Sequence, residues 1–240
     1  MKSRPAFIAA LPREIAPLVN RLADHWRCNV AQRRRGIYLY WNDRAIVACA
    51  GMGAHRAALA TEAALGAGPV SSLTSIGWAG ACDHSLAVGA VVEPGLVIDA
   101  GTGERFGSGA RPVLVTVPIP AGVAEKSRLA ESYSAALVDM EAAAVARLAL
   151  ARNIPFCALK AISDDADFEL LDMVRFVSAT GQFREAAFGL YVALRPWRWS
   201  SVLKMTQSSK LAAENLAIAI RRRIETPTEE GHDGGFSDEK

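Results

Sequence analysis

The stretch that decides the fold is Ile154–Asp167, which reads IPFCALKAISDDAD. Its central part, Phe156–Ile162, is a short apolar run with one lysine, the length and composition of a strand buried on both faces. Acidic residues follow within a few positions, at Asp164, Asp165 and Asp167. The sequence therefore predicts carboxylates at the carboxyl end of a buried strand.

A second acidic pair lies just upstream. Leu137–Leu150 reads LVDMEAAAVARLAL, a strand end that passes into an alanine-rich helix, with Asp139 and Glu141 at the junction. In open parallel α/β sheets, ligands bind at the edge formed by the carboxyl ends of the strands. We therefore expect both acidic groups to face one binding site at that edge.

The composition favours one soluble α/β domain. The chain has 240 residues, of which 51% are hydrophobic, enough for one sizeable core. The net charge of +2 does not favour nucleic acid as a partner, and the four cysteines are too scattered for a metal site or a disulfide framework. No apolar run approaches the roughly 20 residues of a membrane span. We expect a cytoplasmic protein.

Short apolar runs predict the remaining strands. Asn42-Asp43 lies between two alternating runs and predicts a hairpin. The glycine-rich segment Gly101–Gly109 is predicted to be a mobile loop. The predicted strands are Ala6–Leu11, Ile37–Trp41, Ala45–Ala50, Ser72–Ile76, Val88–Val92, Gly95–Ile98 and Val113–Val117.

Three local features are candidates for the site. Glu14 follows Pro12 at the start of a helix, where an acid often does no more than complement the helix dipole. The turns Gly51–Gly53 and Gly77–Gly80 lack large side chains apart from Met52 and Trp78, so they leave room for a flat ligand or for backbone amides to approach one. Each signal is weak when it is taken alone.

The C-terminal part is predicted to be helical. Leu170–Val177 and Phe183–Leu194 have helical patterns, and a basic amphipathic helix with tryptophans spans about residues 196–224. Such a helix can lie on an anionic membrane, but packing on the sheet is the more general explanation of its amphipathic pattern. Residues 225–240 lack apolar periodicity and are predicted to be a disordered tail, so the domain spans 1–224.

Taken together, these motifs resemble one family. The segments are ALPREIAPL, GMGAHRAALAT, SIGWAGACDHSLAVGAVV and, above all, LVDMEAAAVA followed by IPFCALKAISDDAD. They are similar, over roughly residues 6–172, to the nucleoside phosphorylase and methylthioadenosine/S-adenosylhomocysteine nucleosidase superfamily. The resemblance implies a single three-layer α/β domain with a central mixed, largely parallel sheet flanked by helices.

The resemblance also implies roles for individual residues. Asp164 matches the acid that protonates the leaving purine, Glu141 matches the glutamate that holds the ribose hydroxyls, and Glu14 matches the carboxylate that positions the attacking water. We expect Asp164 to hold a proton near neutral pH, because burial and the like charges of Asp165 and Asp167 oppose its ionisation. The substrate-binding positions implied are Met140, Ser163, Met52, Gly77, Trp78, Ala79, Gly80 and Arg13.

Several residues depart from the family pattern. Trp78 stands where a small serine or threonine is usual, which narrows the pocket. Asp139 replaces a glutamate, Ala142 a glycine and Lys160 an arginine. The segment that supplies the base-stacking aromatic in the family is shortened here, and the candidates for that role are Val117, Ile119 and Phe106.

The predicted reaction is hydrolysis of a purine nucleoside, with adenine as the leaving base and with neither a metal nor another cofactor. Phosphorolysis is an alternative, because Arg13, Arg35 and Arg56 could bind phosphate. A third possibility is a lipid-linked adenosine: the V-D-M-E variant, the shortened middle and the tryptophan-bearing helix resemble the hopanoid-associated branch, which acts on adenosylhopane. The helix would then contact the membrane peripherally. A silent nucleoside-binding module is the remaining alternative, and the family implies a homo-oligomer.

Overall fold

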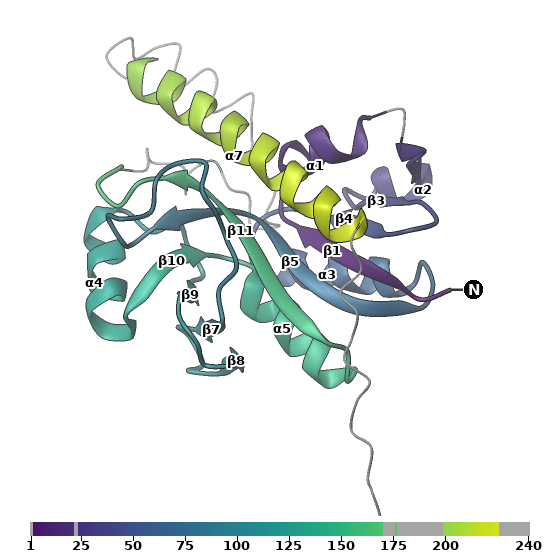
Figure 1. Cartoon of the computed structure of the whole chain (residues 1–240), viewed down its shortest axis with the longest axis horizontal. Helices are drawn as coiled ribbons and strands as arrows, with labels where there is room; N and C mark the ends of the chain where they lie inside the picture. Colours follow the sequence, from purple (N-terminus) through teal and green to yellow (C-terminus); the bar gives the residue numbers. More distant parts are fainter. Residues whose placement is uncertain (1, 22–23, 170–175, 177–198, 226–240) are drawn as a thin grey trace, which may run out of the picture.

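The computed structural model describes residues 2–21, 24–169, 176 and 199–225, and within this part the chain forms one three-layer α/β unit (Figure 1). The strands are β1 Arg4–Ala9, β2 Arg27–Cys28, β3 Tyr38–Trp41, β4 Ile46–Cys49, β5 Val70–Ala81, β6 Val91–Val92, β7 Leu96–Asp99, β8 Arg105–Gly107, β9 Val113–Thr116, β10 Ala135–Asp139 and β11 Phe156–Asp164. The helices are α1 Pro12–Val19, α2 Val30–Arg33, α3 Ala54–Leu65, α4 Val123–Tyr133, α5 Ala142–Ala151 and α7 Trp199–Glu225.

The sheet is mixed, with parallel strands at its centre. Its order is β2-β3-β4-β1-β5-β10-β9-β7-β8, and β11 pairs with β5 and β6 outside this path. The strands β4, β1, β5 and β11 run parallel to one another, whereas β10 meets the end of β5 in antiparallel fashion. The carboxyl ends of β1, β5 and β11 therefore lie at one edge, as the sequence predicted.

Strand β1 explains why the sheet is covered on both faces. Phe7 and Ala9 belong to one core cluster, and Ala6 and Ile8 belong to another. Successive side chains of a strand point to opposite faces, so a continuous apolar run needs a partner on each side. Helices α3 and α5 supply that partner on the second face, mainly through alanines that let them lie close to the sheet.

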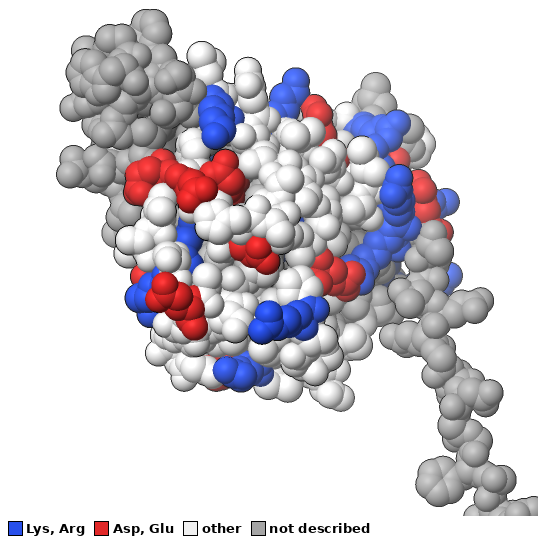
Figure 2. Space-filling model, turned by 60° about the vertical axis from the view of Figure 1, so that its left-hand side comes forward, with Lys and Arg blue, Asp and Glu red and all other residues white. Residues whose placement is uncertain are grey.

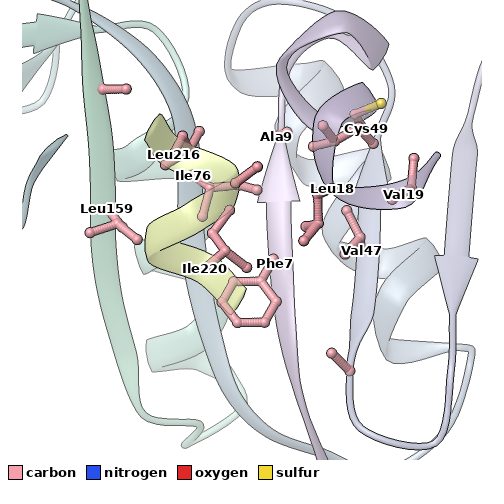
Figure 3. Packing of buried hydrophobic residues seen from close by; sticks show 14 of the residues in the cluster. Phe7, Ala9, Leu18, Val19, Val47, Cys49, Ile76, Leu159, Leu216 and Ile220 are labelled. Carbon is pink, nitrogen blue, oxygen red and sulfur yellow. The ribbon is translucent and has the colours of Figure 1, made fainter. Parts of the chain in front are cut away.

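Helices α1 and α7 cover the first face. Leu18 of α1 and Leu216 and Ile220 of α7 pack with Phe7 and Ile76 of the sheet (Figure 3). Among the side chains of α7 that the structure describes, residues 203–225, the buried ones lie from Ala212 onward, and the first turns of the helix extend beyond the sheet (Figure 1). The prediction that this helix packs on the sheet is confirmed for this C-terminal part.

The sequence located most strands but erred in detail. The hairpin around Asn42 forms, and β5 is longer than the predicted segment Ser72–Ile76. The predicted loop Gly101–Gly109 was wrong in part, because β8 lies within it and pairs with β7. Helix α4 was not predicted at all, since its sequence VAEKSRLAESY carries only a short apolar face.

Some predictions fall outside the described residues. These are the tail beyond Glu225, the helical segment Phe183–Leu194 and, apart from Phe176, the segment Leu170–Val177. Among the residues that are described, no helix is both long and apolar enough to cross a membrane. On the face drawn in Figure 2, an elongated group of acidic side chains lies toward the upper left and an elongated group of basic ones at the right, with mostly uncharged side chains between them.

Candidate active site

A cavity of about 440 Å³ opens at the sheet edge where the acidic groups were predicted to meet. Its walls come from the ends of β1, β10 and β11 and from α1, α4 and α7. The lining residues are Ala10, Leu11, Arg13, Glu14, Ala16, Pro17, Met52, Trp78, Gly80, Val117, Pro120, Ala121, Lys126, Val138, Asp139, Met140, Glu141, Ser163, Asp164, Met205, Thr206, Ser209, Lys210, Ala213 and Glu214. The volume is within the usual range for small-molecule sites.

Glu14 is held in place by the backbone at the start of its own helix. Its Oε2 accepts hydrogen bonds from the amides of Ala10 at 2.9 Å and Leu11 at 3.0 Å. The side chain is buried, and this burial raises the pKa of Glu14, while those amides and the charge of Lys160 act in the opposite direction. Glu14 thus stabilises its helix and also presents a carboxyl group to the cavity.

Glu141 joins two elements that are far apart in sequence. It precedes α5, and its Oε1 accepts a hydrogen bond of 2.7 Å from the amide of Gly53, in the turn before α3. Burial, followed by the nearby charge of Asp139, raises the pKa of Glu141 to about 8. Burial thus favours the protonated form of this carboxyl in the absence of a bound sugar.

Two departures from the family pattern form one contact. Lys160 Nζ lies 2.8 Å from Asp139 Oδ2, and it also donates to Ser75 Oγ at 3.0 Å. Asp139 accepts further hydrogen bonds from the Thr116 hydroxyl at 2.7 Å and the Ala142 amide at 2.9 Å. This buried pair fixes the start of α5, and with it the position of Glu141.

Asp164 has different neighbours from those predicted. Its Oδ2 lies 2.5 Å from Nζ of Lys126 on α4, and its Oδ1 accepts a hydrogen bond of 2.6 Å from Ser163. The carboxylates of Asp165 and Asp167 have other neighbours, Lys204 at 3.5 Å and His84 at 3.3 Å respectively. The charged partner of Asp164 in the structure is therefore a buried cation and neither of these two acids.

The glycines of the second turn make room for catalytic candidates rather than for a ligand. A Cβ at Gly77, where φ is +125°, would lie 2.9 Å from Glu14 Oε2. A Cβ at Gly80 would lie 2.8 Å from Asp164 Oδ2. Gly80 lines the cavity, whereas Gly77 and Ala79 lie behind its wall. The Ala79 carbonyl instead accepts a hydrogen bond from Ser163.

The remaining predicted binding residues also lie at the cavity. Met52, Met140 and Ser163 line the cavity, and so does Trp78, whose ring lies 5.3 Å from the Arg13 guanidinium. Trp78 thus narrows one wall without closing the cavity.

The three candidates for a base-stacking residue also separate. Val117 lines the cavity, whereas Phe106 is buried in a core cluster and Ile119 is 58% exposed. Of the three, only Val117 therefore remains a candidate for contact with a bound base.

Sequence reasoning missed two parts of the wall. The first is Lys126, which no motif marked. The second is the segment of α7 from Met205 to Glu214, which was assigned either to the membrane or to the sheet. A charged residue within the apolar stripe of α4 was the one signal available for Lys126, and the helix itself had not been recognised.

The fold and this cavity define a class: a three-layer α/β protein with a carboxylate-lined site at the carboxyl edge of its central sheet. A family model described as the phosphorylase superfamily matches residues 4–121 and 101–193. The chain therefore belongs to the phosphorylase superfamily. Among curated protein sequences, none matches the chain significantly.

Solved structures share the fold at low identity. A mutant methylthioadenosine nucleosidase of Helicobacter pylori, with 5′-methylthioadenosine in its active site, has a TM-score of 0.70 at 15% identity, covering 94% of this chain and 99% of its own. The Arabidopsis thaliana 5′-methylthioadenosine nucleosidase has a TM-score of 0.71 at 18% identity, and the match covers 95% of this chain and 97% of its own. Helicobacter pylori futalosine hydrolase has a TM-score of 0.69 at 15% identity, and the match covers 93% of this chain and 97% of its own. At such identities the likeness concerns the fold.

Proposed function

We propose that the protein hydrolyses the N-glycosidic bond of a purine nucleoside, with adenine as the leaving base. The observation that carries this proposal is that three carboxyl groups from separate elements, those of Glu14, Glu141 and Asp164, line one cavity. Membership of the phosphorylase superfamily and a fold shared with nucleosidases support the reaction class.

The chemistry needs these three groups in different roles. Cleavage of a ribosyl–purine bond passes through a sugar cation similar to that of glycoside hydrolysis. In the proposal, Asp164 delivers a proton to the departing base and Glu141 accepts hydrogen bonds from the sugar hydroxyls. Glu14 takes a proton from the water that attacks the anomeric carbon, a role for which its ionised form is required.

The charges around the cavity favour water over phosphate as the nucleophile. Glu14 would repel a phosphate placed beside it. Arg35 and Arg56, which were considered as phosphate ligands, are not among the lining residues, whereas Arg13 is. Lys126 also lines the cavity, but its ammonium group is bonded to Asp164 and to backbone carbonyls. Phosphorolysis therefore stays the alternative, with Arg13 as its strongest support.

A base-release assay tests the proposal. The purified protein is incubated with 5′-methylthioadenosine, adenosine and inosine, each with and without inorganic phosphate, and the free base and the sugar product are measured. We expect adenine and free ribose or methylthioribose to form at the same rate in both conditions. Formation of a sugar 1-phosphate that requires phosphate would contradict hydrolysis. Absence of any free base would contradict the proposal altogether.

A lipid-linked adenosine is a second candidate substrate, because part of the cavity lining is apolar. The lining includes the apolar residues Ala16 and Pro17 of α1 and Met205 and Ala213 of α7, beside the polar residues Thr206, Ser209, Lys210 and Glu214 of the same helix α7. The apolar residues could contact an apolar group carried on the ribose 5′ carbon. Helix α7 also carries exposed hydrophobic side chains, including Leu203.

Two measurements separate this candidate from a small nucleoside. Hydrolysis rates are compared for 5′-methylthioadenosine and for adenosine with a long alkyl chain at the 5′ carbon, and the protein is sedimented with anionic liposomes. A preference for the long chain together with co-sedimentation would support a lipid-linked substrate. Preference for the short substrate, with the protein left in the supernatant, would exclude it.

The silent binding module is the least favoured alternative. It rested on Trp78 filling the pocket, and a cavity of about 440 Å³ is present beside that side chain. Binding of a nucleoside without turnover, unchanged by Asp164→Asn, would support it. A homo-oligomer and a cytoplasmic location stay predictions; the first is tested by sedimentation velocity of the full chain.

A further inference from the structure

Lys126 is a buried cation in the wall of the cavity that no motif marked. Its side chain is 1% exposed, and Nζ donates to Asp164 Oδ2 at 2.5 Å, to the carbonyl of Asp165 at 2.7 Å and to that of Phe168 at 3.4 Å. An ammonium group has three N–H bonds. All three are directed at groups of the protein, so Lys126 can act on a bound base only through Asp164.

This pairing raises a question about the proposed reaction. A lysine ammonium in contact with a carboxylate stabilises the charged form of both groups. An ionised Asp164 has no proton to give, although the departing base needs one. The nearest proton is the one on Lys126 Nζ, in the hydrogen bond to Oδ2.

We propose that Lys126 is a positioning residue that orients Asp164 and holds, in the resting site, the proton that Asp164 passes to the leaving base. The inference rests on the proposed nucleosidase function. It assigns the acid to a pair of residues, one on α4 and one at the end of β11, rather than to a protonated aspartate alone.

The steps balance as follows. The bond between the anomeric carbon and the base nitrogen breaks, and its electron pair stays with the base. In the same step Lys126 Nζ gives its proton to Asp164 and Asp164 gives a proton to a ring nitrogen of the base, so that Asp164 stays a carboxylate and Lys126 becomes a neutral amine. The water oxygen bonds to the anomeric carbon while its proton goes to Glu14. After both products leave, solvent returns that proton from Glu14 to Lys126.

Two other ionisable groups near the Lys126–Asp164 pair, Cys82 and Glu125, are poorly suited to supply the proton. Cys82 faces the pair from the end of β5, and burial raises the pKa of this thiol to about 11, so it stays neutral. Glu125 on α4 is held by Arg128 at 2.6 Å, which lowers the pKa of that carboxyl.

The other charged side chains around the Lys126–Asp164 pair have partners of their own or lie across the cavity from it. Asp165 is paired with Lys204 and Asp167 with His84. Glu169 lies near Gly122, where its Oε2 accepts from the Val123 amide. Across the cavity stand Glu14, Glu141, Asp139, Arg13, Lys210 and Glu214.

A comparison of leaving groups separates proton supply from a purely structural role. Wild type, Lys126→Met, Lys126→Arg and Arg128→Met are assayed at about pH 8 with 5′-methylthioadenosine and with 4-nitrophenyl β-D-ribofuranoside, whose nitrophenolate leaves without a proton. We expect Lys126→Met to lose about 10²- to 10⁴-fold in kcat on the nucleoside, the usual range for general acid catalysis. Its loss on the nitrophenyl riboside should be less than about tenfold.

The other two variants are controls. Lys126→Arg keeps a cation beside Asp164, but a guanidinium does not give up a proton in a protein, so this variant should lose about as much activity on the nucleoside as Lys126→Met. Arg128→Met removes an exposed ion pair from the same helix and should change neither rate. An equal loss on both substrates in Lys126→Met would overturn the proposal, because it would show a structural role alone. Unchanged activity on the nucleoside would overturn it as well.

A measurement without turnover keeps the inference separate from the proposed function. The side-chain carboxyl ¹³C resonance of Asp164, identified by its loss in Asp164→Asn, is followed in the wild type from about pH 5 to pH 9. We expect the shift of an ionised carboxylate throughout. A protonated Asp164 at pH 7 would overturn the proposal even if the enzyme is active. An ionised Asp164 would support the resting state of the pair even if Lys126→Met does not fold, whereas absence of purine nucleoside cleavage would overturn the proposed function and with it the proton transfer.

Discussion

The protein buries two lysine–carboxylate pairs, Lys160–Asp139 and Lys126–Asp164, and the two pairs differ in how far the carboxylate is exposed to the cavity. In the Lys160–Asp139 pair both side chains are at most 1% exposed, although Asp139 is among the residues that line the cavity, and both form further hydrogen bonds within the protein. The Lys126–Asp164 pair is formed between a similarly buried lysine and a carboxylate that is 9% exposed at the cavity wall.

This difference in exposure separates a closed pair that supports the fold, Lys160–Asp139, from an open pair that can contact a ligand, Lys126–Asp164. An ionised carboxylate has about four lone-pair sites for hydrogen bonds. Asp139 uses three of them, on Lys160, the Thr116 hydroxyl and the Ala142 amide, and it anchors the start of α5. Asp164 uses two, on Lys126 and Ser163. Asp164 meets the cavity, where a ligand can exchange with its present partners. Burial of an ion pair therefore does not by itself indicate a functional site; access to a cavity does.

The largest expected effect is on activity at the open pair. Asp164→Asn removes the group that delivers the proton, so kcat on a purine nucleoside should fall by about 10²- to 10⁴-fold. The measurement is steady-state release of free base. Circular dichroism should show a folded protein, because water in the cavity can solvate the lysine that is left unpaired. Retention of more than about a tenth of the wild-type rate would contradict the assigned role.

The closed pair should show its effect in stability. Asp139→Asn leaves Lys160 charged and buried without its counter-ion, which typically costs about 3–5 kcal/mol. Urea denaturation measures the change in the free energy of unfolding. Glu125→Gln, which breaks the exposed pair with Arg128, is the matched control and should change stability little. A small effect of Asp139→Asn would remove the distinction between the two pairs.

The closed pair also acts on Glu141, because the charge of Asp139 helps to raise the pKa of that carboxyl to about 8. The folded protein then holds a proton on Glu141 that the unfolded chain releases above its ordinary value of 4.5. This contribution to stability is full below pH 4.5 and is lost as the pH rises toward 8.

Glu141→Gln should therefore flatten the pH dependence of stability. We expect the free energy of unfolding of the ligand-free wild type to fall by more between pH 5 and about pH 8.5 than that of Glu141→Gln. Urea denaturation of both proteins at the two pH values checks this. An identical fall in both would show that Glu141 is ionised in the empty cavity at neutral pH.

Activity should depend on pH in the opposite direction. Burial raises the pKa of Glu14 and of Glu141, and both must be ionised in the proposed reaction. We therefore expect kcat/KM to rise with pH on an acid limb displaced from the ordinary glutamate range toward neutral. A pH profile of kcat/KM tests this, and a flat profile between pH 5 and pH 8 would contradict it.

The smallest expected effect comes from crowding the open pair. Gly80→Ala would place a Cβ 2.8 Å from Asp164 Oδ2 and 3.0 Å from Lys126 Cε, so the pair must shift. A displacement below 1 Å should lower kcat by about tenfold, less than the effect of a full 1 Å misplacement. Gly66→Ala, at a helix end away from the cavity, is the control and should leave kcat unchanged.

Much of the fold could be predicted from sequence because its signals are local. Continuous apolar runs marked β1, β9 and β11, and the turn at Asn42-Asp43 marked a hairpin. The predictions failed where the local signal was weak, at β8 within a glycine-rich segment and at α4. Glu14, Glu141 and Asp164 line one cavity, as predicted, because each lies at a strand end or a helix start at the predicted edge; their roles stay predictions.

By itself, the sequence determined the class of fold and the edge at which carboxylates gather, since apolar periodicity and strand ends are properties of short stretches. Only the tertiary structure decided that Asp164 is paired with Lys126, 38 positions away, and not with the acids beside it. Ion pairing depends on distances of a few ångströms between side chains, and those distances are set when α4 packs on β9 and β10.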